Sequence, residues 1–558
     1  MAAFPQYDWI FALITIALCA SSFGNGANDV ANSYATSVAA RTLTLAQVGV
    51  LAAITEFIGA VALGRGVTDT IKNGIIDIDH FKNDPAVLIL VFACAEFGSA
   101  SWLLIATKTG FPVSTTQTVV GALVGAGIAS RAGISWSWDS GGVAQVAASW
   151  GVAPCLAACI AAILFATLKY SILEREDSFQ KAMRAIPFYL AFTAGVLALF
   201  IVIEAPVIGG LDALGAGASA GIILGVFFGV LIIAYVFLIP YFKLRLVRQD
   251  PRVRAWHIPL GPLLLREDPP LYFPGKDDAI VTDYYANARS DASSNQLDPK
   301  IEAKEGKEGK QEGALKEGNE GVGEQQEPNT NPSPDSGAGQ TKAHAPSLEA
   351  VERGHVKGFK RMPEPEERWL KPVSHLFILH PTRLWAITKY VLLQGVSRDC
   401  VTHTSDHLAD VHSRAKHYDL RVEHLWTYAQ VASAMMMSIA HGSNDVANAI
   451  GPWVGAYMTW QSGEVSDETD TPIWILIAAG LLLGAGFWFM GFHIIRSLGN
   501  KLTQVSPTRG FAMELGAAIT VLLASSLDLP VSTTQCLTGA VIGILTVMAL
   551  NTPQFGQG

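Results

Sequence analysis

The chain has 558 residues, and half of them are apolar. Its charged fraction of 16% lies well below the roughly 25% of soluble proteins, and its mean hydropathy is positive at +0.32. The net charge of −9 excludes nucleic acid as an expected partner. Because the apolar residues come in long runs, the composition predicts an all-α integral membrane protein that lies in a lipid bilayer.

The apolar runs predict about eleven membrane spans, since a helix needs roughly 20 apolar residues to cross a bilayer. The first half of the chain, residues 1–243, holds seven of them, at 8–40, 44–65, 86–107, 112–131, 143–169, 186–206 and 218–243. The second half, residues 425–558, holds four, at 425–459, 473–495, 510–526 and 531–550.

The first span of each half is too long for one straight crossing, and each has glycine and polar residues at its middle, around Gly26 and Gly442. This pattern predicts two broken helices. The arms on either side of Pro112 and of Pro530 predict re-entrant hairpins with tips at membrane depth. Irregular backbone is tolerated there only where it lines a cavity or is buried in protein.

A polar loop, residues 244–424, joins the two halves. Its middle, about 290–360, is rich in Lys, Glu, Gly, Pro and Ser and nearly free of aromatic residues, which predicts disorder. Residues 379–401 predict an amphipathic helix at the membrane surface, leading into the second half.

Basic residues fall mainly on one side of the predicted spans if the helices simply alternate. This side would hold Arg41, Lys169, Arg175, Lys181, Arg184, Lys243, Arg245, Arg496, Lys501 and Arg509. Because cytoplasmic loops carry an excess of Lys and Arg, we expect a multi-pass protein with its N-terminus outside and the large loop in the cytoplasm.

The second half repeats the first. Asn28, Asp29 and Asn32 recur 416 residues later as Asn444, Asp445 and Asn448. The run Pro-Val-Ser-Thr-Thr-Gln begins at Pro112 and recurs 418 residues later, at Pro530. Duplicated polar breaks in a membrane protein are typical of a transport site between two inverted-topology repeats.

The two Asn/Asp clusters are candidate cation sites. An ionised Asp at the centre of a membrane helix costs about 2.5–3.5 kcal/mol on insertion scales, so Asp29 and Asp445 need a compensating partner. Carboxylate and amide oxygens suit small hard cations, which favours sodium, with a proton as the other possibility. The candidate ligands are Asn28, Asp29, Asn32, Asn444, Asp445 and Asn448. The simpler interpretation, that these residues only cap helix ends, is weakened because the cluster occurs twice.

The two Pro-Val-Ser-Thr-Thr-Gln runs are candidate anion sites. Proline starts a helix well, and the N–H groups and hydroxyls of a first helical turn can cradle an anion. The candidate residues are Ser114, Thr115, Thr116, Gln117, Ser532, Thr533, Thr534 and Gln535. Ordinary N-capping is the alternative, but it needs one hydroxyl where each run has three.

Neither motif contains Arg or Lys. An anion beside two aspartates would be repelled, so cations have to lie between them. With a negative cell interior, importing an anion costs about 2.3 kcal/mol per charge per 100 mV. Entry together with cations removes this cost and couples uptake to the ion gradient.

Three further carboxylates lie within apolar runs. Glu96 and Glu514 are again 418 residues apart, which favours a role in ion coupling or gating. Glu56 has no counterpart in the second half, and an ion-coupling role and a purely structural hydrogen-bonding role are equally compatible with its sequence context.

With four motif copies in this order, the sequence resembles the inorganic phosphate transporter (PiT) family, in particular the fungal high-affinity sodium/phosphate symporters. The resemblance extends through both apolar halves, including 73–87 and 504–515, and leaves out the large loop. It implies a plasma-membrane symporter for inorganic phosphate that is driven by sodium or protons and needs no cofactor. It also implies phosphate near Ser114–Gln117 and Ser532–Gln535, cations at the Asn/Asp clusters, and a fold that allows homodimers.

Two features depart from the family pattern. The family usually has twelve spans and eleven are predicted here, because the second half has no counterpart of the helix that begins near Trp150. The second half therefore looks truncated, and whether a chain of this form transports is left open. Gln117 also stands where relatives often have His.

Other functions remain open from the residues alone. Hydroxyl and N–H groups would accept sulfate or another tetrahedral oxyanion equally well. A phosphate sensor that binds without turnover is also compatible with the long loop. An enzyme is not expected, because the sequence has no phosphate-binding P-loop, no nucleophile paired with a base and no zinc-ligand spacing.

Overall fold

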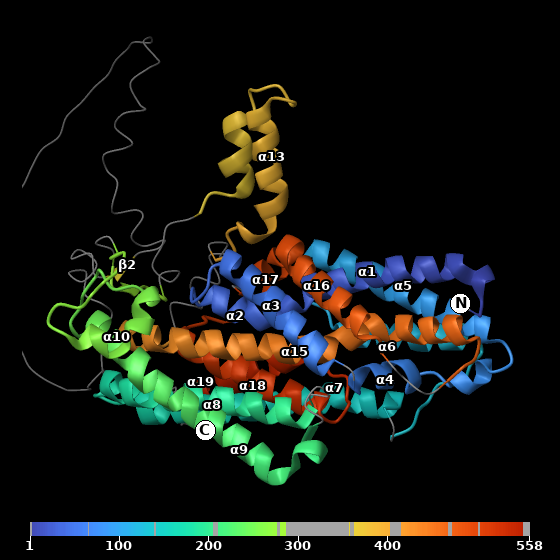
Figure 1. Cartoon of the computed structure of the whole chain (residues 1–558), viewed down its shortest axis with the longest axis horizontal. Coiled ribbons are helices and arrows are strands. Elements are labelled where there is room, and N and C mark those ends of the chain that lie inside the picture. Colours follow the sequence, from blue (N-terminus) through green and yellow to red (C-terminus); the bar gives the residue numbers. More distant parts are fainter. Residues whose placement is uncertain are drawn as a thin grey trace, which may run out of the picture.

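The computed structural model describes residues 3–64, 66–138, 141–204, 210–275, 279–285, 356–357, 362–401, 415–466, 471–499 and 503–550. These residues are mostly helical, and the long helices lie side by side along the long axis of the molecule (Figure 1). The predicted all-α class is confirmed.

The first half contains ten helices among the residues described. They are α1 (Asp8–Asn28), α2 (Val30–Ala39), α3 (Leu45–Leu63), α4 (Gly66–Asn73), α5 (Pro85–Thr109), α6 (Thr115–Ala129), α7 (Val143–Leu168), α8 (Ser178–Glu204), α9 (Gly210–Ile233) and α10 (Ile239–Phe242).

The second half has five helices in its described part. They are α15 (Leu420–Ser462), α16 (Ile473–Met490), α17 (Phe492–Gly499), α18 (Pro507–Ser525) and α19 (Thr533–Ala549). α15 runs through the middle of the bundle (Figure 1) and packs on α1, α3, α5, α8 and α18. Both halves therefore share one core along this helix.

The first of the two predicted helix breaks is reduced to one residue. α1 ends at Asn28 and α2 begins at Val30, but Asp29 between them keeps φ and ψ of −92° and −30° and its N–H bonds to the carbonyl of Asn25, so the helix continues with little change of path. The expected break in 425–459 is wrong, because α15 is continuous through Asn444 and Asp445. Its central Gly442 serves close packing instead: a Cβ there would lie 2.6 Å from the backbone oxygen of Glu56 on α3.

The two proline motifs lie at the turns of two helical hairpins. The first joins α5 to α6 and the second joins α18 to α19, and in both the motif residues before the second arm are not helical. The second arms have 15 and 17 residues. Each is shorter than the roughly 20 residues of a straight crossing, which supports the predicted hairpins.

Seven helical stretches are long and apolar enough to cross a membrane, among the residues described. They are Pro5–Ala39, Leu45–Leu63, Pro85–Thr109, Val143–Leu173, Ser178–Ile203, Leu214–Val247 and Ile473–Met490. α15 and α18 hold many of the buried polar residues and are not among the seven. The predicted count of eleven therefore remains a prediction.

The described residues of the loop between the halves form several short elements, among them a helical segment at Ala255–Leu265. A two-residue parallel pairing joins β1 (Val281–Thr282) to β2 (Val356–Lys357). Further on, a helix, α13 (Pro381–Leu393), lies within the predicted range 379–401; its place at the membrane surface stays a prediction. The stretch expected to be disordered, 290–360, lies outside the described residues except for β2.

Twin glycines of the two hairpins have different surroundings. On α19, a Cβ at Gly543 would lie 2.1 Å from the backbone oxygen of Ala158 on α7. At the matching position on α6, a Cβ at Gly125 would have no atom within 4 Å in the described part of the chain. One hairpin arm is thus tightly covered by a neighbouring helix, and its twin has an open face.

Because of this difference, replacing each glycine by alanine should change the stability of the protein in different ways. Gly543→Ala should destabilise the protein by about 1–3 kcal/mol, since the backbone of α7 has to shift. The matched change Gly125→Ala should leave stability unchanged or raise it slightly through helix propensity. Thermal unfolding in detergent at one scan rate compares the two variants; equal midpoints would contradict the packing described here.

Candidate functional site

The two Asn/Asp clusters each hold one hairpin tip in the same way. Asn28 accepts a hydrogen bond from the backbone N–H of Val113 at 3.0 Å and donates to the carbonyl of Phe111 at 3.1 Å. In the second half, Asn444 accepts from the N–H of Val531 at 3.3 Å and donates to the carbonyl of Leu529 at 3.1 Å. The side chains of both amides are therefore used to fix backbone that has no helical partner.

The two aspartates receive matching threonine hydroxyls. The Thr115 hydroxyl donates to Asp29 Oδ2 at 2.8 Å, and the Thr533 hydroxyl donates to Asp445 Oδ2 at 3.2 Å. Thr115 also lies within 3.3 Å of Asp445 Oδ2. One hydroxyl thus touches both carboxylates, so the two aspartates, far apart in the sequence, meet at one buried centre.

A second set of contacts crosses between the halves. Asn32 of the first half donates to the Thr534 hydroxyl at 2.7 Å, and Asn448 of the second half donates to the Thr116 hydroxyl at 2.8 Å. Each hairpin tip is held by both polar clusters. The contacts come in matched pairs, as expected for two duplicated halves that face each other.

The serines of the two proline motifs have a local role. Ser114 accepts from the N–H of Gln117 at 3.2 Å, and Ser532 accepts from the N–H of Gln535 at 3.3 Å. These are ordinary N-caps, the alternative considered from the sequence. The capping accounts for one hydroxyl in each motif, and the threonine hydroxyls reach the Asn/Asp clusters instead.

Several buried oxygens at this centre lack a hydrogen-bond partner among the described residues. They include the side-chain carbonyl oxygens of Asn32 and Asn448, which occupy matching positions, and that of Asn25. A buried acceptor left unpaired costs about 1–3 kcal/mol. Together with two carboxylates, these free oxygens form a donor set that suits sodium.

The sequence reasoning missed His441. Its Nδ1 lies 2.7 Å from Glu56 Oε2, and its Nε2 lies 3.1 Å from Asp445 Oδ2. Asp29, His441 and Asp445 offer ligand atoms within 4.8 Å of one another, and all three side chains are buried. His441 could have been noticed because it lies one helical turn before Asp445 inside an apolar span. The matching position of the first half, 416 residues earlier, is Asn25.

Glu56 belongs to the same network. Besides His441, it accepts a hydrogen bond from the hydroxyl of Ser438 at 2.5 Å, and it is fully buried. Its partner His441 comes from the second half, so this contact joins the two halves.

The twin carboxylates Glu96 and Glu514 have unlike surroundings. Glu514 accepts hydrogen bonds from Thr36 at 2.5 Å, Ser37 at 2.7 Å, Ser433 at 2.6 Å and Gln430 at 3.3 Å. Glu96 is fully buried, and the one side-chain hydroxyl beside its carboxyl group in the part of the chain described is that of Ser21. Neither glutamate makes a hydrogen bond to the Asp29–Asp445 centre in the described part of the chain.

A cavity of about 720 Å³ lies against the first hairpin tip. Its lining includes polar groups of both tips, among them Ser114, Gln117, Thr534 and Gln535. None of the described lining residues is Arg or Lys. This space is large enough for a small anion with accompanying ions. Neither aspartate lines it, but Thr534, which does, donates to Asp29 Oδ1 at 3.3 Å.

A polar centre that is built from two duplicated halves and buried among apolar helices defines a membrane transport protein. The chain belongs to the phosphate transporter family, whose family model matches residues 25–556. The resemblance noted from the motifs is thereby confirmed.

Relatives of known name match over most of their length. The phosphate-repressible phosphate permease pho-4 of Neurospora crassa is 36% identical, and the match covers 97% of this chain and 91% of the permease. The sodium-dependent phosphate transporter 1-A of Danio rerio is 29% identical, with 92% and 86% covered. A solved structure of a sodium-dependent phosphate transporter matches with a TM-score of 0.58 at 22% identity, covering 98% of this chain and 92% of that one. That structure supports the fold.

The hydroxyl of Thr115 gives a direct test of the site geometry. Thr115→Val keeps the shape but removes an oxygen that lies against both aspartates and can serve as a cation ligand. The sodium concentration for half-maximal phosphate uptake should therefore rise about tenfold, equivalent to ~1.4 kcal/mol. The control is Thr538→Val on α19, where the hydroxyl bonds only to the carbonyl of Thr534. Equal sodium dependence in both variants would count against the shared centre.

Proposed function

We propose that the protein imports inorganic phosphate together with sodium ions, as a secondary active transporter of the plasma membrane. The observation that carries the proposal is the buried centre in which Asp29 and Asp445 meet beside a cavity without Arg or Lys in its described lining. Two ionised aspartates would repel an anion from this site unless cations are bound there as well.

Sodium would lie at the two Asn/Asp clusters. Asp29 and Asp445 supply the negative charge, and the unpaired oxygens of Asn32 and Asn448 supply neutral ligands in matching positions. Asn28 and Asn444 act differently, because both their oxygen and their nitrogen are used on the hairpin backbone. Their part is to hold the tips against the cation ligands.

Phosphate would lie in the cavity beside the tips, on the bound sodium ions and near the N-termini of α6 and α19. The first-turn N–H groups of a helix favour an anion, and Gln117 and Gln535 lie in the cavity wall. The candidate residues are those predicted, Ser114, Thr115, Thr116, Gln117, Ser532, Thr533, Thr534 and Gln535. The hydroxyls of Thr115 and Thr534 would connect the anion to the carboxylates that hold the cations.

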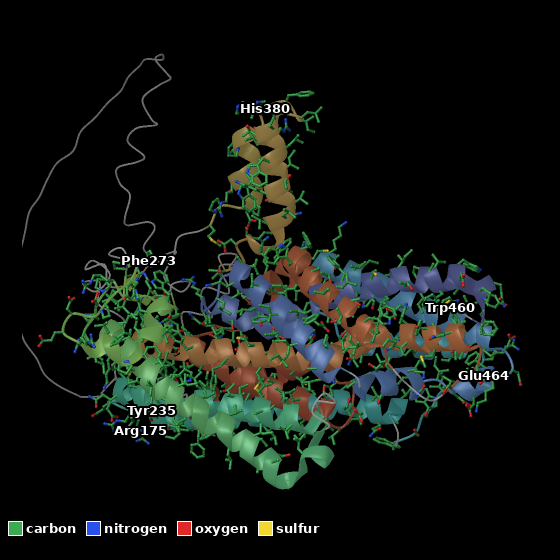
Figure 2. The ribbon with its side chains drawn as sticks, in the orientation of Figure 1. Arg175, Tyr235, Phe273, His380, Trp460 and Glu464 are labelled. Atoms are coloured by element: carbon green, nitrogen blue, oxygen red, sulfur yellow. The ribbon has the colours of Figure 1, made fainter. Side chains whose placement is uncertain are left out.

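The membrane arrangement we propose has two inverted repeats, with both hairpins re-entrant and the N-terminus outside. Glu464 and Trp460 then lie at the outer end of the bundle and Arg175 at the cytoplasmic end (Figure 2). If the phosphate and its accompanying cations carry a net positive charge, a negative cell interior favours their uptake by about 2.3 kcal/mol per net charge per 100 mV. A homodimer is part of the same proposal.

The three glutamates would serve coupling or gating. Glu514 holds together Thr36 of α2 and Ser433 of α15, so loss of its charge would loosen these two helices near the cytoplasmic end. The contact of Glu56 with His441, and of His441 with Asp445, favours a second form of coupling in which a proton replaces one cation.

Uptake of radiolabelled phosphate in a transporter-deficient host tests the proposal. Replacing sodium with choline at several pH values should reduce uptake strongly at each pH; uptake that instead follows pH alone would show proton coupling. Excess sulfate should not compete. If sulfate is itself carried, the protein is a general oxyanion transporter, and binding without accumulation would indicate a sensor.

The aspartates should be individually essential. Asp29→Asn and Asp445→Asn keep the shape but remove one charge each, so sodium-dependent uptake should fall at least tenfold at equal surface expression. Asp177→Asn, at an exposed ion pair with Lys181, is the matched control and should transport normally. Wild-type uptake and sodium dependence in both site variants would overturn the cation assignment.

A further inference from the structure

A helical hairpin of the large loop stands off the transmembrane bundle. Its first arm is formed by the helical turns Glu366–Leu370 and Lys371–Val373, and its second arm is α13. The hairpin points away from the bundle, across the direction of the long helices, and His380 lies at its far end (Figures 1 and 2).

The base of this hairpin is firmly attached. Trp488 at the end of α16 donates its indole N–H to the carbonyl of Leu392 at 2.7 Å. A Cβ at Gly395 would lie 2.1 Å from the backbone oxygen of Trp488, so only glycine permits this close approach. Arg398 pairs with Glu366 at 2.7 Å. The direction of the hairpin is therefore fixed by the fold.

The hairpin exposes a continuous apolar surface. Along α13, Trp385 is 60% exposed and Leu392 is 52% exposed, and the spacing of Leu384, Trp385, Val391 and Leu392 places them on one helix face. The turn before α13 adds Phe377 at 72% and Leu379 at 65%. In water, such a surface would be unusual for a segment that is otherwise folded.

The same hairpin carries an excess of positive charge. Residues 366–393 contain four basic side chains and two acidic ones, and one of the acidic residues, Glu366, is already paired with Arg398. Arg368 and Lys371 are exposed. The ammonium group of Lys389 lies 5.1 Å from the ring centre of Trp385. In this arrangement the ring can enter an apolar medium while the ammonium group stays in the polar layer at its surface.

The position of the hairpin base along the transmembrane helices indicates which medium surrounds the hairpin. Its base contacts the end of α16 at Trp488 and the beginning of α3, where a Cβ at Gly49 would meet Val396. In the proposed orientation these are the cytoplasmic ends of two spans, close to Arg496. A rigid arm that runs sideways from this level follows the membrane plane at the cytoplasmic boundary.

We propose that this hairpin is embedded in the cytoplasmic leaflet and binds anionic phospholipid headgroups. Its apolar face and tip enter the region between headgroups and acyl chains, while Arg368, Lys371 and Lys389 contact lipid phosphates. The tryptophan and basic side chains are of the types that anchor proteins at this depth. The proposal rests on the membrane orientation given above, and it does not depend on phosphate transport.

Spin labelling of the full chain in vesicles tests this placement without requiring turnover. The exposed cysteines, Cys19, Cys94, Cys155 and Cys159, are first replaced by alanine. Labels introduced through Trp385→Cys and Leu392→Cys should collide several-fold more often with oxygen, which dissolves in lipid, than with a water-soluble nickel chelate. A label through Glu367→Cys, on the exposed polar side of the first arm, should show the reverse.

The role of the basic side chains of the hairpin is tested by varying the anionic lipid in the vesicles. With phosphatidylserine in the vesicles the labels at 385 and 392 should lie deeper than in pure phosphatidylcholine. The double variant Arg368→Gln, Lys371→Gln should lose this difference, and Lys181→Gln, at an exposed cytoplasmic ion pair, should keep it. A depth independent of phosphatidylserine would overturn the headgroup assignment.

Two other results would overturn the proposal as a whole. High collision with the nickel chelate at 385 and 392 would show that the hairpin lies in water. Low collision with both reagents, together with dipolar coupling between labels on different copies, would show that a second chain covers it. Phosphate uptake by the same labelled proteins, measured in parallel, shows separately whether the transport proposal holds.

Discussion

The structure depends on the meeting of two aspartate side chains inside an apolar protein. Asp29 and Asp445 come from opposite halves of the chain, and the hydroxyl of Thr115 lies within hydrogen-bond distance of both. If both were ionised, the two carboxylates would need positive charge between them. Both hairpin tips are placed by the amides that flank these aspartates, so the contacts that hold the polypeptide together also bring the two carboxyl groups to one place.

Duplication explains why the site can serve a transport cycle. Each tip is held by one amide from its own half and one from the other half, as Asn28 and Asn448 show for the first tip. Movement of one half against the other would therefore alter both tips at once. The Glu56–His441 contact and the four donors around Glu514 depart from this symmetry.

The sequence indicated which residues would meet because they occur twice at nearly constant offsets. Both Asn/Asp clusters and both proline motifs lie together in the structure, and α13 lies within the range where a helix was expected; the binding roles of these residues stay proposals. The continuity of α15 could not be foreseen, since Gly442 permits a break as readily as it permits close packing on α3, and only the tertiary neighbour decides. His441 was missed because it has no twin, and the unlike surroundings of Glu96 and Glu514 depend on side chains from distant helices.

Binding of phosphate to the purified full chain, measured by calorimetry with and without sodium, tests the central claim most directly. If cations at Asp29 and Asp445 create the anion site, phosphate should bind at least a hundredfold more tightly in sodium than in choline. Sodium should bind more tightly by a reciprocal factor when phosphate is present, as linkage requires. Equal phosphate affinity in the two salts would contradict the account.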